Sequence, residues 1–379
     1  MQQQSKAKKA LIPAWVGAAC VWFGTHCGPG AASGNQTVAY YVKYGLWSLV
    51  MPIVAMTFLG FGVYYAMEFA RRTRATDFKD FANKLFHPYE KIFANLFEFS
   101  FIGTVGLSGG SCVATASSLF HDYFNAPIWV GVIAIVVCTI VFSIYGEDLV
   151  RNASTAMSVI IFVAIIAVVV AGVGSNGGVG PSFAGRSLAD ASGAAALWSS
   201  VLYAAFQSTG VFGACIGVVH GLGGRKEIQK TVIFGGIINA LFLILVALML
   251  LGYPDSLKET LPNFWVITHV GAPILVACYV AVVFFACATN TISFSNALSG
   301  RYGKFFKIKN QTLVKFIIAV IMLVYVSAFS RLGLSRIVGT GFKYLGYFCI
   351  VTLLIPTIFV GRKKLKGMAA EEKAETSLN

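Results

Sequence analysis

The sequence predicts an all-α protein that crosses a membrane about ten times. Its 379 residues are 57% hydrophobic and only 12% charged, whereas about 25% of a soluble domain is charged. Apolar runs of about 20 residues fill nearly the whole chain, and the ten-residue alternation typical of a membrane barrel is absent. Because lipid cannot hydrogen-bond the backbone, each run is expected to form a helix.

The expected spans follow one another with few long connections. They are placed at 12–42, 46–70, 92–121, 126–145, 152–172, 194–220, 228–252, 264–299, 312–330 and 338–360. We expect 11–172 to be a first five-helix repeat and 194–360 a second, inverted one, joined by a Gly-rich extracellular loop at 173–193. Residues 1–10 and the polar tail 361–379, which is expected to be disordered, lie outside the repeats.

Basic residues set the predicted orientation. The formal charge is +14, and Lys and Arg gather in the connections 70–92, 220–230 and 300–315 and in the tail. The alternate connections are poor in basic residues, which predicts that both termini are cytoplasmic in the cell inner (plasma) membrane. Because the basic residues lie in the connections, the expected partners are membrane lipid and a small-molecule solute, and nucleic acid is not expected. The chain is expected to be a monomer or a homodimer.

The first span carries helix breakers where an unbroken helix is expected. Residues 23–35 read FGTHCGPGAASGN, with Gly28, Pro29 and Gly30 at the centre. The sixth span contains FQSTGVFGACIG at 206–217, a Gly-rich stretch five spans later. An odd spacing makes the two spans cross in opposite directions. The sequence therefore predicts broken helices 1 and 6 at equivalent positions of the two repeats.

A broken helix leaves backbone N–H and C=O groups without partners. Such ends are tolerated inside a membrane where they line a cavity. Free N–H groups favour an anion and free carbonyls a cation, and paired interrupted helices indicate the midplane site of a transporter. The alternative is that the glycines only let helices pack closely.

Two motifs support a family resemblance. CGPGAASGNQ at 27–36 resembles the first-helix motif of YkvI-like membrane proteins, which look like members of the amino-acid–polyamine–organocation superfamily with the LeuT fold. CATNTISFSNALSGRYGK at 287–304 resembles the eighth-helix pattern. The chain departs from the first motif at Asn35–Gln36, where the family has Gln–Glu, and by carrying His26 and Pro29 in the break.

The resemblance implies a sodium site between the first and eighth spans. The carbonyls of Gly24 and Cys27 would be its ligands from the first span, with Thr289, Asn290 and Ser293 from the eighth. Residues 289 and 293 share a helix face. The alternative is that these hydroxyls bond only to their own helix. Sodium is the one cofactor expected, and no organic cofactor is implied.

The resemblance also implies a substrate site beside the breaks. An anionic group of the solute would meet the N–H groups of the second half of span 1, and polar side chains of spans 1, 3 and 6 would contact its other parts. The expected substrate-binding residues are Thr25, His26, Gly28, Gly30, Ala31, Ser108, Ser111, Phe206, Gln207, Ser208 and Thr209. For Ser108 and Ser111, close helix packing beside Gly109 and Gly110 is an equal alternative.

These features predict a secondary active transporter that carries an amino acid or a similar solute inward with sodium by alternating access. One alternative is proton coupling through His26, whose ordinary pKa is near neutrality. Another is a channel or uniporter. An enzyme is not expected, because the five histidines form no metal-binding pattern. Two carboxylates, Glu98 and Glu68, are expected to pair with basic residues at the inner face.

Overall fold

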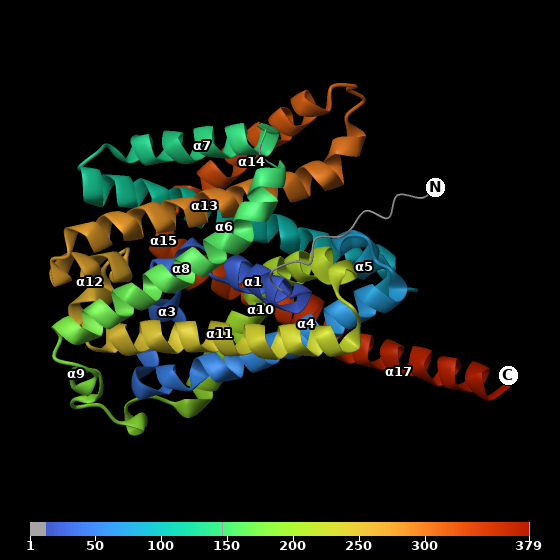
Figure 1. The fold of residues 1–379 in the computed structure, drawn as a ribbon, viewed down its shortest axis with the longest axis horizontal. Helices are drawn as coiled ribbons and strands as arrows, with labels where there is room; N and C mark the ends of the chain where they lie inside the picture. Colours follow the sequence, from blue (N-terminus) through green and yellow to red (C-terminus); the bar gives the residue numbers. More distant parts are fainter. Residues whose placement is uncertain (1–12, 146, 379) are drawn as a thin grey trace, which may run out of the picture.

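The computed structural model describes residues 13–145 and 147–378, and within these ranges the chain is helical (Figure 1). The longer helices are α1 Ala14–His26, α4 Met51–Thr73, α5 Phe78–Phe86, α6 Glu90–Phe124, α7 Ile128–Tyr145, α8 Glu147–Ser175, α10 Gly193–Val218, α11 Arg225–Leu251, α12 Pro262–Val270, α13 Pro273–Tyr302, α14 Gln311–Ser330, α16 Phe342–Cys349 and α17 Ile355–Leu378. The shorter ones are α2 Pro29–Ala32, α3 Asn35–Tyr40, α9 Gly180–Phe183 and α15 Leu334–Arg336.

Seven helical stretches among the described residues are long and apolar enough to cross a membrane. They are α4, α6, α10 with its 3₁₀ extension, α11, α13 with its extension, α14, and the stretch Leu334–Ala374 formed by α15 to α17. Two shorter apolar helices, Ile128–Ile144 and Val159–Ser175, match the expected fourth and fifth spans. The expected first span is divided among α1, α2 and α3.

The interrupted first span lies in the middle of the helix arrangement (Figure 1). Helix α1 packs against α8, α10 and α11, and α10 packs in turn against α4. Helices α6, α7, α13 and α14 pack together as a second group, and α8 runs across the molecule in front of α1 (Figure 1). The interruption that follows α1 therefore lies in the interior, where α8, α10 and α11 pack around α1.

Pro29 and its glycine neighbours explain where the first span is interrupted. Helix α1 ends at His26, Gly28 is extended with ψ of −179°, and α2 starts at Pro29. Pro29 has no N–H to continue the helix, and its fixed φ suits the first turn of a new one. Gly34 then adopts a left-handed φ of 86°, which permits the turn into α3.

The expected break in the sixth span is wrong. Helix α10 runs unbroken from Gly193 to Val218, through Gly210 and Gly213. No proline removes a donor there, and a glycine inside a helix costs only about 1 kcal/mol relative to alanine. A methyl group would fit at both positions in ordinary contact: a Cβ on Gly210 would lie 3.6 Å from Thr25 Cγ2, and one on Gly213 would lie 3.5 Å from the ring of Phe78.

Three other expectations need correction. The predicted span 264–299 is two helices, α12 and α13, because Gly271 is left-handed with φ of 73° and Pro273 begins the second helix. The tail 361–379 is helical as far as Leu378 rather than disordered. The connection 70–92 contains the short helix α5, which begins where Asp77 caps the N–H groups of Lys79 and Asp80.

The last span is also irregular. Two π-helical segments, Ile337–Gly341 and Ile350–Leu354, flank α16 on either side. Gly346 of α16 faces α10 at close range, because a Cβ there would lie 2.9 Å from the Leu202 carbonyl oxygen. Such π segments often occur near functional sites. The segment Ile350–Leu354 contacts α10, the helix that α1 also contacts.

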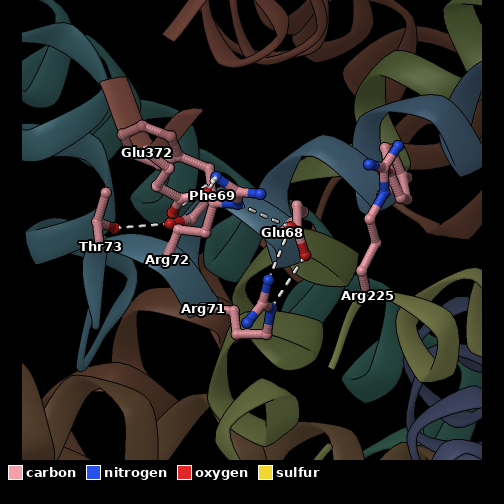
Figure 2. A network of polar contacts seen from close by, with 8 residues as sticks. Glu68, Phe69, Arg71, Arg72, Thr73, Arg225 and Glu372 are labelled. Atoms are coloured by element: carbon pink, nitrogen blue, oxygen red, sulfur yellow. Dashed lines mark hydrogen bonds and ion pairs between the residues drawn. The ribbon is translucent and has the colours of Figure 1, made fainter. Parts of the chain in front are cut away.

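Both expected carboxylate pairs are confirmed. Glu68 is buried and bonds Arg71 and Arg72, and Arg72 also reaches Glu372 of α17 at 3.3 Å (Figure 2). Glu98 of α6 accepts hydrogen bonds from Arg301 and Tyr302 of α13 and from Lys79 of α5. These ion pairs join the tail and the connection 73–90 to the membrane helices.

Candidate site at the interrupted helix

The interruption leaves three backbone oxygens of the first span without partners. Among the described residues, no N–H donates to the carbonyls of Gly24, Thr25 or Cys27. Pro29 lacks the N–H that would bond Thr25 in a continuous helix. Gly24 and Thr25 are half-buried and Cys27 is fully buried. Two of these oxygens, those of Gly24 and Cys27, are the ones expected to bind a cation.

The N–H groups beyond the interruption are only partly available. The N–H groups of Gly28 and Gly30 make no hydrogen bond with a described residue. The N–H of Ala31, expected to contact an anion as well, already donates to the Gly28 carbonyl at 3.1 Å. A binding role for the Ala31 N–H is therefore not favoured, whereas the other two donors remain open.

A buried polar cluster joins the two parts of the first span to α10. The Tyr203 hydroxyl lies 2.9 Å from Nε2 of His26 and 3.3 Å from Oε1 of Gln36, and Gln207 Nε2 donates to it at 3.2 Å. Gln207 Nε2 also lies 3.5 Å from the His26 carbonyl oxygen. All four side chains are at least nine-tenths buried, and the cluster contains no acidic or permanently basic group.

The opposite nitrogen of His26 faces α11. His26 Nδ1 and Asn239 Oδ1 are both buried without a well-aligned hydrogen bond, yet the two side chains are close enough to interact. Asn239 Nδ2 donates to the Gly235 carbonyl at 2.7 Å, which leaves its oxygen for His26. The imidazole therefore contacts Tyr203 of α10 through Nε2, while Nδ1 and the nearby Asn239 oxygen of α11 stay without a hydrogen bond.

Aromatic side chains cover the cluster on the α16 side. Phe206 stacks on Phe342 of α16 with ring centroids 4.7 Å apart, and Tyr40 packs on both Tyr203 and Phe206. These rings are buried. Phe206 was expected to contact substrate, and the structure places it between the polar cluster and the irregular last span.

Only one of the three expected ligands on α13 faces the interruption. A Cβ on Gly28 would lie 3.0 Å from Asn290 Nδ2, so the Asn290 amide lies directly against the break. Thr289 donates to the Phe285 carbonyl, Ser293 donates to the Thr289 carbonyl, and Ser293 is exposed. Bonding within their own helix accounts for both hydroxyls, so the geometry does not favour them as ligands.

The hydroxyls expected on the third and sixth spans are also bonded locally. Ser111 donates to the Ser108 carbonyl and Ser208 to the Ala205 carbonyl. Thr209 contacts the Cys349 sulfur of α16 at 3.3 Å. The neighbouring Gly109 packs against Val326 of α14. Close packing is therefore the better account of these residues, although Ser108 itself remains half-buried.

Residues that the sequence reasoning did not select cover the far side of the interruption. Asn263 of α12 donates to the Ala32 carbonyl at 2.9 Å, and its own N–H bonds the Ser33 carbonyl. Tyr279 also donates to Ala32, at 3.0 Å. These bonds fasten α12 and α13 onto α2. Asn263 lies in the first turn of α12 and is fully buried. Its contact with α2 could be recognised only in the folded structure.

The polar cluster adds Gln36, Tyr203 and Asn239 to the expected site. Gln36 had a sequence signal, because it stands at a departure from the first-helix motif. Asn239 had a weaker one, as a lone amide inside an apolar span. Within the described ranges, no group of three or more His, Cys, Asp or Glu side chains could hold a metal ion.

Comparison with known proteins places the fold. No protein-family model and no curated protein matches the sequence. Among solved structures, a Na⁺-coupled sialic acid symporter in a substrate-bound outward-open state matches at TM-score 0.63 and 14% identity, over 93% of this chain and 90% of that one. The manganese transporter of Eremococcus coleocola matches at TM-score 0.55 and 12% identity, over 94% and 83%. Mhp1 in its inward-facing conformation matches at TM-score 0.51 and 13% identity, over 92% and 76%.

These three neighbours are transporters with the LeuT fold, and the chain shares that fold over nearly its whole length. At such low sequence identity, the structural similarity establishes the architecture alone. It does not support the particular YkvI-like family.

Proposed function

We propose that this protein is a secondary active transporter that carries a small organic solute together with a cation. The observation that carries the proposal is the interruption of the first span at Cys27–Gly28, in the interior of a LeuT-fold helix arrangement. Unpaired backbone groups inside a membrane are costly unless they bind a ligand or line a cavity. The alternating-access motion of such folds would expose this site to each side in turn.

The proposed cation site is formed by the carbonyl oxygens of Gly24 and Cys27 and the amide of Asn290. Hard cations such as sodium prefer oxygen ligands. Two of the groups come from the end of α1 and the third from α13, and none has a hydrogen-bond partner among the described residues. Sodium is the cation proposed, in keeping with the unpaired oxygens and the absence of a basic residue in the polar cluster.

The proposed solute site lies beside it, at the half-buried Thr25 and Gly28 and the polar cluster of His26, Gln36, Tyr203 and Gln207. Two open N–H donors, those of Gly28 and Gly30, would meet a carboxylate, as in an amino acid. A solute without net charge fits best, because an ion buried without an opposite charge is costly. The termini are proposed to be cytoplasmic and the membrane the plasma membrane, from the basic connections.

Uptake into proteoliposomes tests this function. Purified protein is reconstituted with potassium inside, and labelled amino acids are added outside with sodium or with choline. Accumulation above the external concentration only in sodium is expected. Asn290→Ala should lose most of this sodium dependence, whereas Asn125→Ala, at the turn after α6, should retain it. Equilibration without accumulation would instead indicate a channel or uniporter.

One observation favours proton coupling as a second candidate. His26 contacts the Tyr203 hydroxyl at 2.9 Å and keeps Nδ1 unpartnered, so a buried titratable ring lies between α1 and α10 at the interruption. The same vesicles with an inwardly directed proton gradient and no sodium distinguish the two. Uptake driven by the proton gradient alone and abolished in His26→Gln would favour this alternative.

A further inference from the structure

The two buried glutamines of the polar cluster each keep one amide atom unused. Gln36 is 5% exposed and Gln207 is 9% exposed. Gln207 Nε2 lies within 3.5 Å of Gln36 Oε1 and donates to the Tyr203 hydroxyl. Among the described residues, nothing accepts from Gln36 Nε2 and nothing donates to Gln207 Oε1. One donor and one acceptor are thus left unpaired on two neighbouring side chains in the core.

The surrounding contacts fix which end of each amide is unused. Gln36 Oε1 is the amide atom that faces the cluster, with the Tyr203 hydroxyl at 3.3 Å and Gln207 Nε2 at 3.5 Å. Gln207 must present its nitrogen, because its neighbours there are the His26 carbonyl, Gln36 Oε1 and the Tyr203 hydroxyl. The reverse orientation would place carbonyl oxygens against each other. The free atoms are therefore an NH₂ group on Gln36 and a C=O group on Gln207.

The free NH₂ group lies on the interruption itself. A Cβ on Gly30 would come within 2.5 Å of Gln36 Nε2. The Gln36 amide therefore packs on Gly30 of α2, one of the two residues with an open N–H group. Gln207 contacts the Gln36 amide from α10. Neither amide contacts a carboxylate, a lysine or an arginine in the described structure. A ligand that bridges them needs an acceptor and a donor of its own but no charge.

We infer that Gln36 and Gln207 recognise an uncharged amide group of the transported solute. Gln36 NH₂ donates to the solute carbonyl, and Gln207 C=O accepts from the solute N–H. This inference rests on the proposed transport function for the place of the site and names the chemical class of its solute. Carboxamides, lactams and ureides carry the required pair. A carboxylate has no N–H, so it would set its charge against the Gln207 oxygen.

The discrimination follows from the cost of unpaired buried groups. A site that hydrogen-bonds a substrate N–H rejects an analogue lacking it far more strongly than an apolar pocket rejects an extra methylene. Here the analogue would bring repulsion in addition to an unpaired acceptor. The amide member of an isosteric pair should therefore bind at least about tenfold more tightly than the carboxylate member.

Matched ligand pairs test the inference on the purified full-length protein. The probes are L-glutamine and L-glutamate, L-asparagine and L-aspartate, and nicotinamide and nicotinate, with binding followed by thermal shift and titration calorimetry. At least one amide should raise the melting temperature by a few degrees at about a hundredfold excess over its Kd. At the same concentration its carboxylate partner should give a clearly smaller shift.

Variants connect the preference to the two residues. Gln36→Leu and Gln207→Leu should each weaken amide binding by about tenfold. Gln229→Leu replaces an exposed glutamine of α11 and should leave the affinity unchanged. Gln36→Asn keeps an amide but withdraws it by one methylene, so it tests the same contact if the leucine variant does not fold.

The outcomes separate this inference from the transport proposal. If the carboxylates bind as well as the amides, or if none of the amides binds, the inference is wrong. If leucine accumulates under a sodium gradient while no amide binds, the transport function stands and only the inference fails. If an amide binds through Gln36 and Gln207 but no solute accumulates, the inference stands and the transport proposal fails.

Discussion

Gly30 lies directly under the side chain of Gln36, with no room for a methyl group between them. A Cβ at Gly30 would meet Gln36 Nε2, Cγ and Cδ at 2.5 to 2.8 Å. The glycine at this position therefore determines where the Gln36 amide lies, and with it the geometry of the polar cluster around Tyr203.

Gly30→Ala should abolish solute binding with a smaller effect on folding. The added methyl group displaces Gln36 from Tyr203 and so removes one hydrogen bond of the polar cluster. We expect uptake to fall by more than about tenfold and the free energy of unfolding to fall by about 1–3 kcal/mol. Gly17→Ala is the control, because no heavy atom lies within 4 Å of its added Cβ; it should transport normally.

Gly28→Leu should abolish coupled transport. A Cβ here would already lie 3.0 Å from Asn290 Nδ2, so a leucine must push α13 away from the break or fill the cation site. Sodium-dependent thermal stabilisation should disappear while expression is retained. Gly28→Ala should give an intermediate effect through a shift of Asn290 alone. Normal sodium-driven uptake by Gly28→Leu would show that the site lies elsewhere.

Tyr203→Phe should loosen the whole polar cluster. The variant removes the one hydroxyl that contacts His26, Gln36 and Gln207. Buried polar groups that lose their partner cost about 1–3 kcal/mol, so we expect a lower melting temperature and weaker solute binding. Tyr89→Phe, at a tyrosine that is 67% exposed, should change neither. Equal melting temperatures for Tyr203→Phe and the parent protein would contradict the assigned contacts.

Glu68 and Glu372 should differ sharply in their effect on stability. Both carboxylates pair with Arg72, but the Glu68 side chain is 3% exposed and that of Glu372 is 67% exposed. Glu68→Gln leaves two arginines without a buried counter-charge and should cost about 3–5 kcal/mol. Glu372→Gln breaks an exposed pair and should cost less than about 1 kcal/mol. Denaturation in mild detergent would compare them, and a reversed order would contradict the burial of Glu68.

The helices could be placed from the sequence because their signals are local. Apolar length located most spans to within a few residues, and Pro29 with Gly28 marked the interruption. The second break was predicted wrongly because glycine alone does not remove a backbone donor, and α10 keeps its hydrogen bonds through Gly210. The division at Gly271 was missed because a left-handed turn between two apolar helices leaves the hydropathy unchanged.

The candidate site was less accessible to sequence reasoning. Thr289 and Ser293 share a helix face, but their spacing does not say which face meets α1, and the neighbouring Asn290 is the residue that does. The polar side chains around His26 come from α10 and α11, far away in the sequence, so no local pattern joins them to it. Gln36 was noticed only as a departure from a motif, and its role depends on Gly30 beneath it.

The first span is divided while α10 is a single rod of 26 residues, about 39 Å long. The two pieces of the first span meet at Cys27–Gly28, and Asn263 and Tyr279 bond to the second piece at Ala32. Tyr203 near the middle of α10 and Gly213, beside the ring of Phe78, lie on the same unbroken helix. One rigid helix thus connects the polar cluster to α5.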